Sequence, residues 1–99
     1  LPAEVEALLK VILVKALCRT ANVEKVDAGP KGAVISLRNN EFPDPAGLIA
    51  YAQRLVGTIK LRPDNKIVIT RVWNDPKSRL NGLFQLTKGL SAIARKAAR

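Results

Sequence analysis

The 99-residue sequence predicts a single α/β domain of the α+β kind, with three helices and a mostly antiparallel four-stranded sheet. Two pairs of short segments alternate apolar and polar residues, and a short turn joins the members of each pair, as in β-hairpins. Three longer segments repeat apolar residues at helical spacing. Short turns favour antiparallel pairing, because parallel strands need long crossover connections. The expected order is therefore helix, hairpin, helix, hairpin, helix.

The first helix is expected over residues 2–19, since Pro2 suits a first turn, where its missing N–H costs no hydrogen bond. Helical spacing gives this segment two apolar sides. The narrower of the two sides carries Val11, Val14 and Cys18. Exposed apolar clusters of this kind tend to mark contact surfaces. We therefore predict a contact face for a partner or a neighbouring domain there, which would be an intramolecular docking face if the chain is part of a larger protein, with burial under the last helix as the alternative. The broader side is predicted to face the core and comprises Val5, Leu8, Leu9, Ile12, Leu13 and Ala16.

Each expected hairpin has its own turn. In the first, residues 23–28 and 33–38 flank the sequence Gly-Pro-Lys-Gly at residues 29–32. In the second, residues 59–62 and 66–73 flank a turn built from proline, aspartate and asparagine. Glycines beside a lysine also suit a phosphate-binding loop. Such a loop needs a longer glycine frame, a Lys-Ser/Thr pair and a helix directly after it, so the hairpin turn is predicted instead.

Two Asp-Pro pairs mark the starts of the other helices, because aspartate caps a helix and proline fits its first position. The second helix is expected to start at Asp44-Pro45 and to end at Gly57, and the third to start at Asp75-Pro76. Roughly opposite the apolar face of the third helix, four basic residues are aligned. This stripe suits phosphates or an acidic surface, although a solvated helix face is the more common reason for such charges. It comprises Lys77, Lys88, Arg95 and Arg99.

Composition limits the chemistry of the chain. Seventeen basic against eight acidic residues give a net charge of +9, which favours anionic partners. With Cys18 as the only cysteine and no histidine, the sequence predicts no internal disulfide, zinc site or imidazole catalyst. Aspartates are expected at a strand end, two helix caps and a turn, so we predict no catalytic, cofactor-binding or metal-binding residue. No apolar run approaches the roughly 20 residues of a membrane span.

The sequence NVEKVDAGPKG at residues 22–32 strongly resembles the C-terminal domain of the bacterial transcription-repair coupling factor, Mfd. The similarity extends to LPAEVE at residues 1–6, KALC at 15–18, Asp44-Pro45 and LRPD at 61–64. Members of that family are multidomain, ATP-driven translocases on double-stranded DNA. They act on RNA polymerase stalled at lesions, and they recruit the excision-repair protein UvrA through a UvrB-like domain.

The resemblance implies that residues 1–99 are one C-terminal regulatory domain of a larger cytoplasmic bacterial protein. The chain lacks a methionine, which agrees with the expectation that it is a piece of a longer sequence. In the family this domain packs against the UvrB-like domain, hides the UvrA-binding surface and restrains the motor. The resemblance implies no catalytic or ATP-binding residue in this region. The alternative expectation, from another class, is an independent nucleic-acid-binding module that uses the basic stripe of the third helix.

Overall fold

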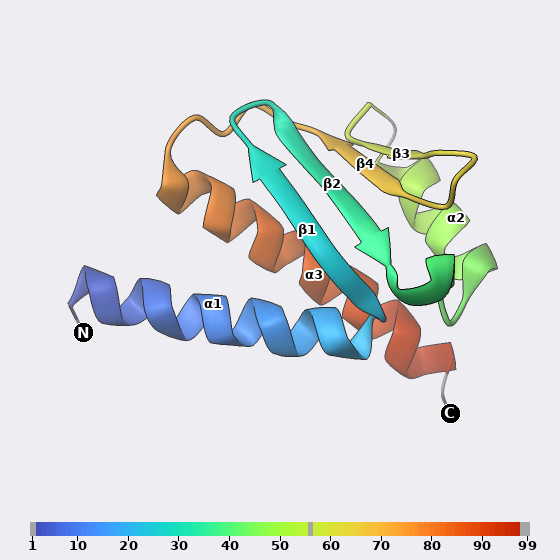
Figure 1. Cartoon of the computed structure of the whole chain (residues 1–99), viewed down its shortest axis with the longest axis horizontal. Helices are drawn as coiled ribbons and strands as arrows, with labels where there is room; N and C mark the ends of the chain where they lie inside the picture. Colours follow the sequence, from blue (N-terminus) through green and yellow to red (C-terminus); the bar gives the residue numbers. More distant parts are fainter. Residues whose placement is uncertain (1, 56, 98–99) are drawn as a thin grey trace.

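The computed structural model describes residues 2–55 and 57–97 and confirms the expected order of elements (Figure 1). Three helices and four strands alternate as helix, hairpin, helix, hairpin, helix, which makes the domain α+β. A short 3-10 helix, η1, follows the first hairpin. The elements are α1 (Ala3–Thr20), β1 (Val23–Gly29), β2 (Gly32–Leu37), η1 (Arg38–Asn40), α2 (Pro45–Arg54), β3 (Ile59–Leu61), β4 (Ile67–Thr70) and α3 (Pro76–Ala97).

The four strands form one sheet in the order β1-β2-β4-β3, and all three neighbouring pairs are antiparallel. The two hairpins join through β2 and β4, so Ile35 on β2 lies opposite Val26 on β1 and opposite Ile67 on β4. The predicted pairing within each hairpin and the mostly antiparallel sheet are therefore confirmed. A register shift between Val23 and Lys25 adds a bulge to β1, which bends the strand and ends strict alternation there.

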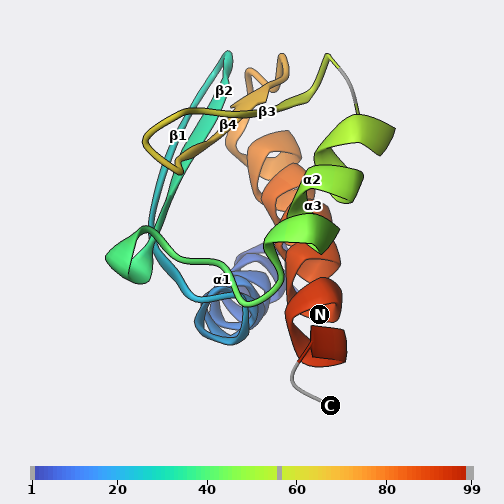
Figure 2. The ribbon, with the colours of Figure 1, turned by 90° about the vertical axis from the view of Figure 1, so that its right-hand side faces the viewer.

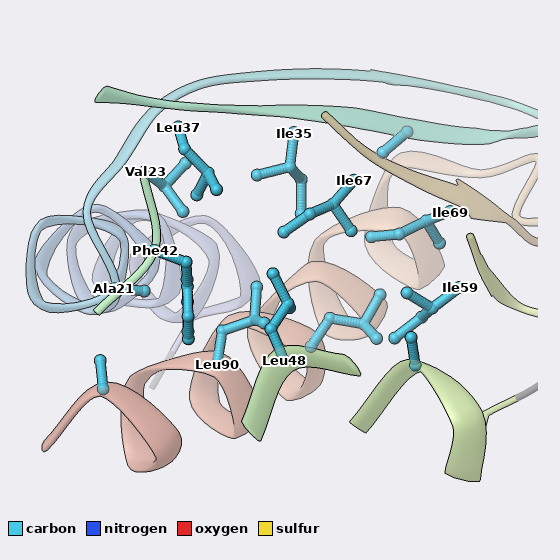
Figure 3. Close-up of a cluster of buried hydrophobic side chains, with 14 of the residues drawn as sticks. Ala21, Val23, Ile35, Leu37, Phe42, Leu48, Ile59, Ile67, Ile69 and Leu90 are labelled. Carbon is cyan, nitrogen blue, oxygen red and sulfur yellow. The ribbon is translucent and has the colours of Figure 1, made fainter. Parts of the chain in front are cut away.

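One face of the sheet is covered by α2 and α3, whereas the opposite face carries no helix (Figure 2). The core lies between these layers and is filled by alternate residues of the strands and by one side of each covering helix (Figure 3). Ile35, Ile67 and Leu90 are almost completely buried. Leu48 and Ala52 are the buried residues that α2 contributes. The predicted apolar face of α3 is confirmed in its central part, where Leu86, Leu90 and Ala94 are buried.

Trp73 locks the second hairpin to the first. β4 ends at Thr70, earlier than the expected strand over residues 66–73, yet the main chain stays attached because the Trp73 N–H donates to the Pro30 carbonyl at 3.0 Å. The indole N–H donates to the carbonyls of Gly29 and Gly32, and the ring is buried. Gly82 on α3 lies directly under the ring, where a Cβ atom would overlap it. Glycine has a low helix propensity, but at position 82 of α3 its lack of a side chain is needed to accommodate the Trp73 ring.

The second helix begins as predicted and ends earlier than predicted. The Gly47 N–H donates to the Asp44 carboxylate at 3.0 Å, which caps α2 as the Asp-Pro pair predicts. The helix then ends at Arg54 rather than at Gly57. Gly57 has a φ of 90° and forms the turn into β3, in which the Thr58 N–H donates to the Leu55 carbonyl at 2.9 Å. Its left-handed conformation is the one that glycine adopts without strain.

The prediction that the broader apolar side of α1 faces the core is wrong. Every member of that side is exposed, and α1 contains no buried residue at all. The inner face of the sheet is already covered by α2 and α3, so α1 packs along α3 and the start of β1 with its narrower side (Figures 1 and 2). The exposed residues are Val5, Leu8, Leu9, Ile12, Leu13 and Ala16.

Candidate interaction surfaces

The aspartates of the domain have local structural roles. Asp44 and Asp75 cap α2 and α3, Asp64 pairs with Arg62 at 2.9 Å in the second turn, and Asp27 lies 3.5 Å from a lysine on exposed β1. Within residues 2–55 and 57–97, no three His, Cys, Asp or Glu side chains come close enough together to hold a metal ion.

The hydrogen bonds of the cap at the start of α3 lower the pKa of the Asp75 carboxylate. The Ser78 hydroxyl donates to Asp75 at 2.7 Å, and the Ser78 main-chain N–H donates to the other carboxylate oxygen at 3.0 Å. These two hydrogen bonds favour the charged form and hold the pKa of Asp75 below its usual value. A carboxylate at this position also interacts favourably with the positive end of the helix dipole.

The Gly-Pro-Lys-Gly sequence forms the hairpin turn that was predicted, with Gly29 opposite Gly32 across the ladder. Gly32 has a φ of 145°, and a Cβ atom there would collide with the carbonyl of Ile69 on β4. Close approach of two strands therefore accounts for this glycine. The exposed Lys31 lies at the tip of the turn, and β2 follows directly, so the helix of a phosphate-binding loop is absent at this position.

The structure places Val11, Val14 and Cys18 on the inner side of α1. Val14 and Cys18 are half-buried, Cys18 contacts the core, and Val11 remains 36% exposed. The three residues line an open hollow of about 590 Å³ between α1, β1 and α3, together with Leu80 and Leu83 of α3. This side of α1 is therefore partly covered, and its docking role remains a prediction.

Burial has a chemical consequence for the thiol in this hollow. Loss of solvent disfavours the thiolate and raises the pKa of Cys18. A protonated, half-buried thiol behaves as a small apolar side chain and is a poor nucleophile. Cys18 is therefore a packing residue of the hollow, as its place in a helix of apolar residues indicates. The edge of the hollow is mostly basic, with Glu24 the acidic residue among Lys15, Arg19, Lys25 and Arg38.

Most of the exposed large hydrophobic residues in the described part of the chain lie on the opposite, outer side of α1. Of the eight large hydrophobic residues that are exposed in the described part of the chain, six lie on this helix. We define the outer face of α1 as Val5, Leu8, Leu9, Ile12, Leu13 and Ala16. The large side chains of this face are exposed to 40% (Val5), 61% (Leu8), 47% (Leu9), 53% (Ile12) and 50% (Leu13). Sequence periodicity identified this face, but its exposure could not be foreseen.

Polar contacts help to fix α1 on α3 with the outer face turned away. The Lys10 ammonium donates to the Asn81 side-chain oxygen at 2.6 Å and lies 5.6 Å from the centre of the Phe84 ring. The Lys88 ammonium lies 5.9 Å from the same ring centre. Cations over an aromatic face are attracted by its quadrupole. Phe84 is therefore occupied by two cations of its own chain, which limits its use as a stacking platform.

The basic stripe of α3 is present on the surface in the part that the structure describes. Lys77, Lys88 and Arg95 are exposed, and Arg99 lies outside the described residues. The three described residues span about 27 Å of helix, since each helical residue rises by about 1.5 Å. Neither of the ion pairs found among residues 2–55 and 57–97 involves these three side chains. The stripe can therefore meet anionic groups, although this property alone fits a solvated helix face equally well.

Sequence reasoning missed one further hollow, between α2 and the ends of the strands. It encloses about 430 Å³, and its floor includes Phe42, Leu48 and Leu61. Arg62 stands at its edge and is already paired with Asp64. Ile49 of α2 borders this hollow and is 49% exposed, which the sequence did not indicate. Among the described helices, none is long and apolar enough to cross a membrane.

The sequence of this chain is similar to that of known proteins over most of its length. Residues 1–48 match the TRCF domain family. Transcription-repair-coupling factors from Rickettsia bellii and Rickettsia prowazekii are each 32% identical over 72 residues, which is 72% of this chain and 6% of those proteins. The factor from Rickettsia conorii is 33% identical over 69 residues, which is 69% of this chain. The chain thus spans about 6% of the length of these curated relatives. With its first helix and first hairpin inside the matched region, the chain belongs to the TRCF domain family of the transcription-repair coupling factors.

Proposed function

We propose that this chain is a non-catalytic regulatory domain at the C-terminal end of a bacterial, cytoplasmic transcription-repair coupling factor. The observation that carries the proposal is the family match over residues 1–48, together with alignments to curated relatives that cover 72 residues of the chain. The parent polypeptide would be an ATP-driven translocase on double-stranded DNA that acts on stalled RNA polymerase. This domain would itself use no ATP, metal or other cofactor.

The proposed action is autoinhibition by docking. The domain packs against other domains of the parent chain, chiefly the UvrB-like domain, and hides the surface that binds UvrA. Two features of the structure suit this role. One is the exposed apolar helix α1, and the other is that Asp44 and Asp75 already cap helices, which leaves them to structure and not to catalysis. Contacts between domains of one chain are usually modest in area and more polar than permanent interfaces, which allows a regulatory contact to open.

Deletion of this domain from the full-length parent tests the proposal directly. We expect deletion to raise both UvrA binding and DNA-stimulated ATP hydrolysis, because the covering domain is gone. Unchanged UvrA binding and unchanged ATP hydrolysis after deletion would reject autoinhibition. The readouts are a pull-down with purified UvrA and a coupled ATPase assay at matched protein concentration.

The hollow beside Val11, Val14 and Cys18 is a proposed contributor to docking. A Val14→Asp variant places a charge in this hollow and should activate the parent partially. Gln53→Asp on the exposed side of α2 is the matched control and should leave both activities unchanged. Because Val14 is half-buried, the thermal unfolding of both variants must be compared first. A well-folded, silent Val14→Asp variant would place the docking contact elsewhere on the domain.

The second candidate function is an independent nucleic-acid-binding module. The observation that favours it is the row of exposed basic residues along α3, in a chain of net charge +9. Four aligned cations neutralise only a few phosphates, and binding without stacking side chains is weak and sensitive to salt. Salt-dependent DNA binding by the isolated chain separates the two candidates.

A further inference from the structure

The outer face of α1 is as large as the largest apolar patch of a typical monomer, and such patches are often functional. Its five large side chains are about half exposed, so together they present on the order of 450 Å² of apolar area, within the range that often marks functional patches. The face is continuous, because Leu9, Ile12 and Leu13 follow each other at helical spacing along the 18 residues of α1. A helix of this length is about 27 Å long, which is enough to support a second helix along its full length.

We propose that the outer face of α1 is the site where an amphipathic helix from the remainder of the parent polypeptide packs, antiparallel to α1. This inference rests on the proposed function and names the surface and the partner of the docking contact. It moves the main contact from the inner side of α1, which is partly filled by α3 and β1, to the side that the domain leaves bare.

Charge along α1 indicates the direction of the partner helix. Glu4 and Glu6 lie in the first turn, whereas Lys15 and Arg19 lie towards the last turn. All four flank the outer face, since they also border the hollows between α1 and its neighbours. Helices generally carry acids at the start and bases at the end, because these charges complement the helix dipole. An antiparallel helix with this common distribution places its bases beside Glu4 and Glu6 and its acids beside Lys15 and Arg19. A parallel helix would bring like charges together.

The available area favours a tethered partner over a second copy of the chain. A stable dimer between separate molecules usually buries about 800 Å² of total surface on each partner, more than the apolar area of about 450 Å² that the outer face presents. A segment of the same polypeptide needs a smaller contact area to stay bound, since a tether holds it at an effective concentration in the millimolar range. The chain spans about 6% of the curated relatives it matches, so such proteins have ample sequence to supply this helix.

Cysteine labelling in the full-length parent tests the face without measuring regulation. Leu9→Cys and Ile12→Cys report on the outer face, and Gln85→Cys on exposed α3 is the matched control. The labelled peptides are quantified by mass spectrometry, so other cysteines do not interfere. We expect a maleimide to react at least about tenfold more slowly at positions 9 and 12 than at position 85, because a packed helix excludes solvent. Rates within about twofold of the control would overturn the inference.

Two further measurements identify the occupant. Cross-links from Lys15 in the parent should fall on one amphipathic helical segment outside residues 1–99, near its acidic end. In sedimentation velocity, the 99-residue chain should remain a monomer up to about 0.5 mM, since its face is too small for a stable dimer. A dimer in which positions 9 and 12 are protected would overturn the inference in favour of a second copy. Protection without activation on domain deletion would support the docking face and reject autoinhibition; activation without protection would do the reverse.

Discussion

Salt dependence of DNA binding gives the sharpest separation between a docking domain and a nucleic-acid-binding module. The basic stripe on α3 has four members, Lys77, Lys88, Arg95 and Arg99, of which Arg99 lies outside the described residues, and each can neutralise at most one phosphate. Each phosphate contact contributes about −0.9 to the slope of log affinity against log salt, so the slope should be no steeper than about −3.6. Between about 50 mM and about 200 mM salt, the affinity should therefore fall by at most about 150-fold.

The assay is fluorescence anisotropy with a labelled duplex of about 20 base pairs and two unrelated sequences. We expect dissociation constants weaker than about 1 µM at physiological salt and no preference between sequences, as for other non-specific contacts. Lys88→Gln should flatten the slope by about 0.9, because it removes one contact. Lys60→Gln on β3 is the control and should leave the slope unchanged. Sub-micromolar, sequence-selective binding, or a slope steeper than about −5, would refute this reasoning and support the nucleic-acid-binding module.

Three further predictions concern stability. Gly82→Ala should lower the free energy of unfolding by about 1–2 kcal/mol in urea titrations, because overlap with the Trp73 ring exceeds the gain of about 1 kcal/mol in helix propensity. At Gly89 an added Cβ meets the hydroxyl and the adjoining ring edge of Tyr51, which is only half-buried and can move aside, so Gly89→Ala should be neutral or stabilising; equal effects at both glycines would contradict the packing argument. Because Ser78 lowers the folded pKa of Asp75, this cap contributes stability above the unfolded pKa and loses it as pH falls through the folded pKa. The urea midpoint of Asp75→Ala should therefore approach that of the native chain in acid, and a pH-independent difference would count against the cap. Finally, α1 contains no buried residue, so hydrogen exchange should show weaker protection for its amides than for those of central α3; equal protection would contradict this.

Local chemistry made much of the fold predictable. The two hairpins, both Asp-Pro helix starts and the antiparallel sheet follow from turn residues, alternation and capping, each of which acts within a few residues. Asp44 shows why such predictions succeed, since its carboxylate accepts a hydrogen bond from a residue only three positions away. The class of the domain follows once these elements are counted in order.

Choices between distant partners could not be predicted in the same way. α1 has two apolar sides, and periodicity identifies both without showing which one meets α3. The bulge in β1 shifts Val23 relative to Lys25, and no turn residue in the strand indicates it. Trp73 is buried because its indole reaches carbonyls more than 40 positions away, and Gly82 leaves room for the ring. These contacts depend on how the helices and strands pack against each other, and the local pattern of a single sequence does not show that packing.

The exposure of α1 also suggests how docking and domain order are linked. This helix is held by half-buried side chains and a lysine contact to Asn81, so its attachment in the free domain is comparatively weak. A partner helix on the outer face would cover its second apolar side and stabilise α1 by mass action. Release of the partner would then both uncover the apolar face and loosen the helix. An element of low local stability is well suited to a contact that opens, because the free energy that separates the two states is small.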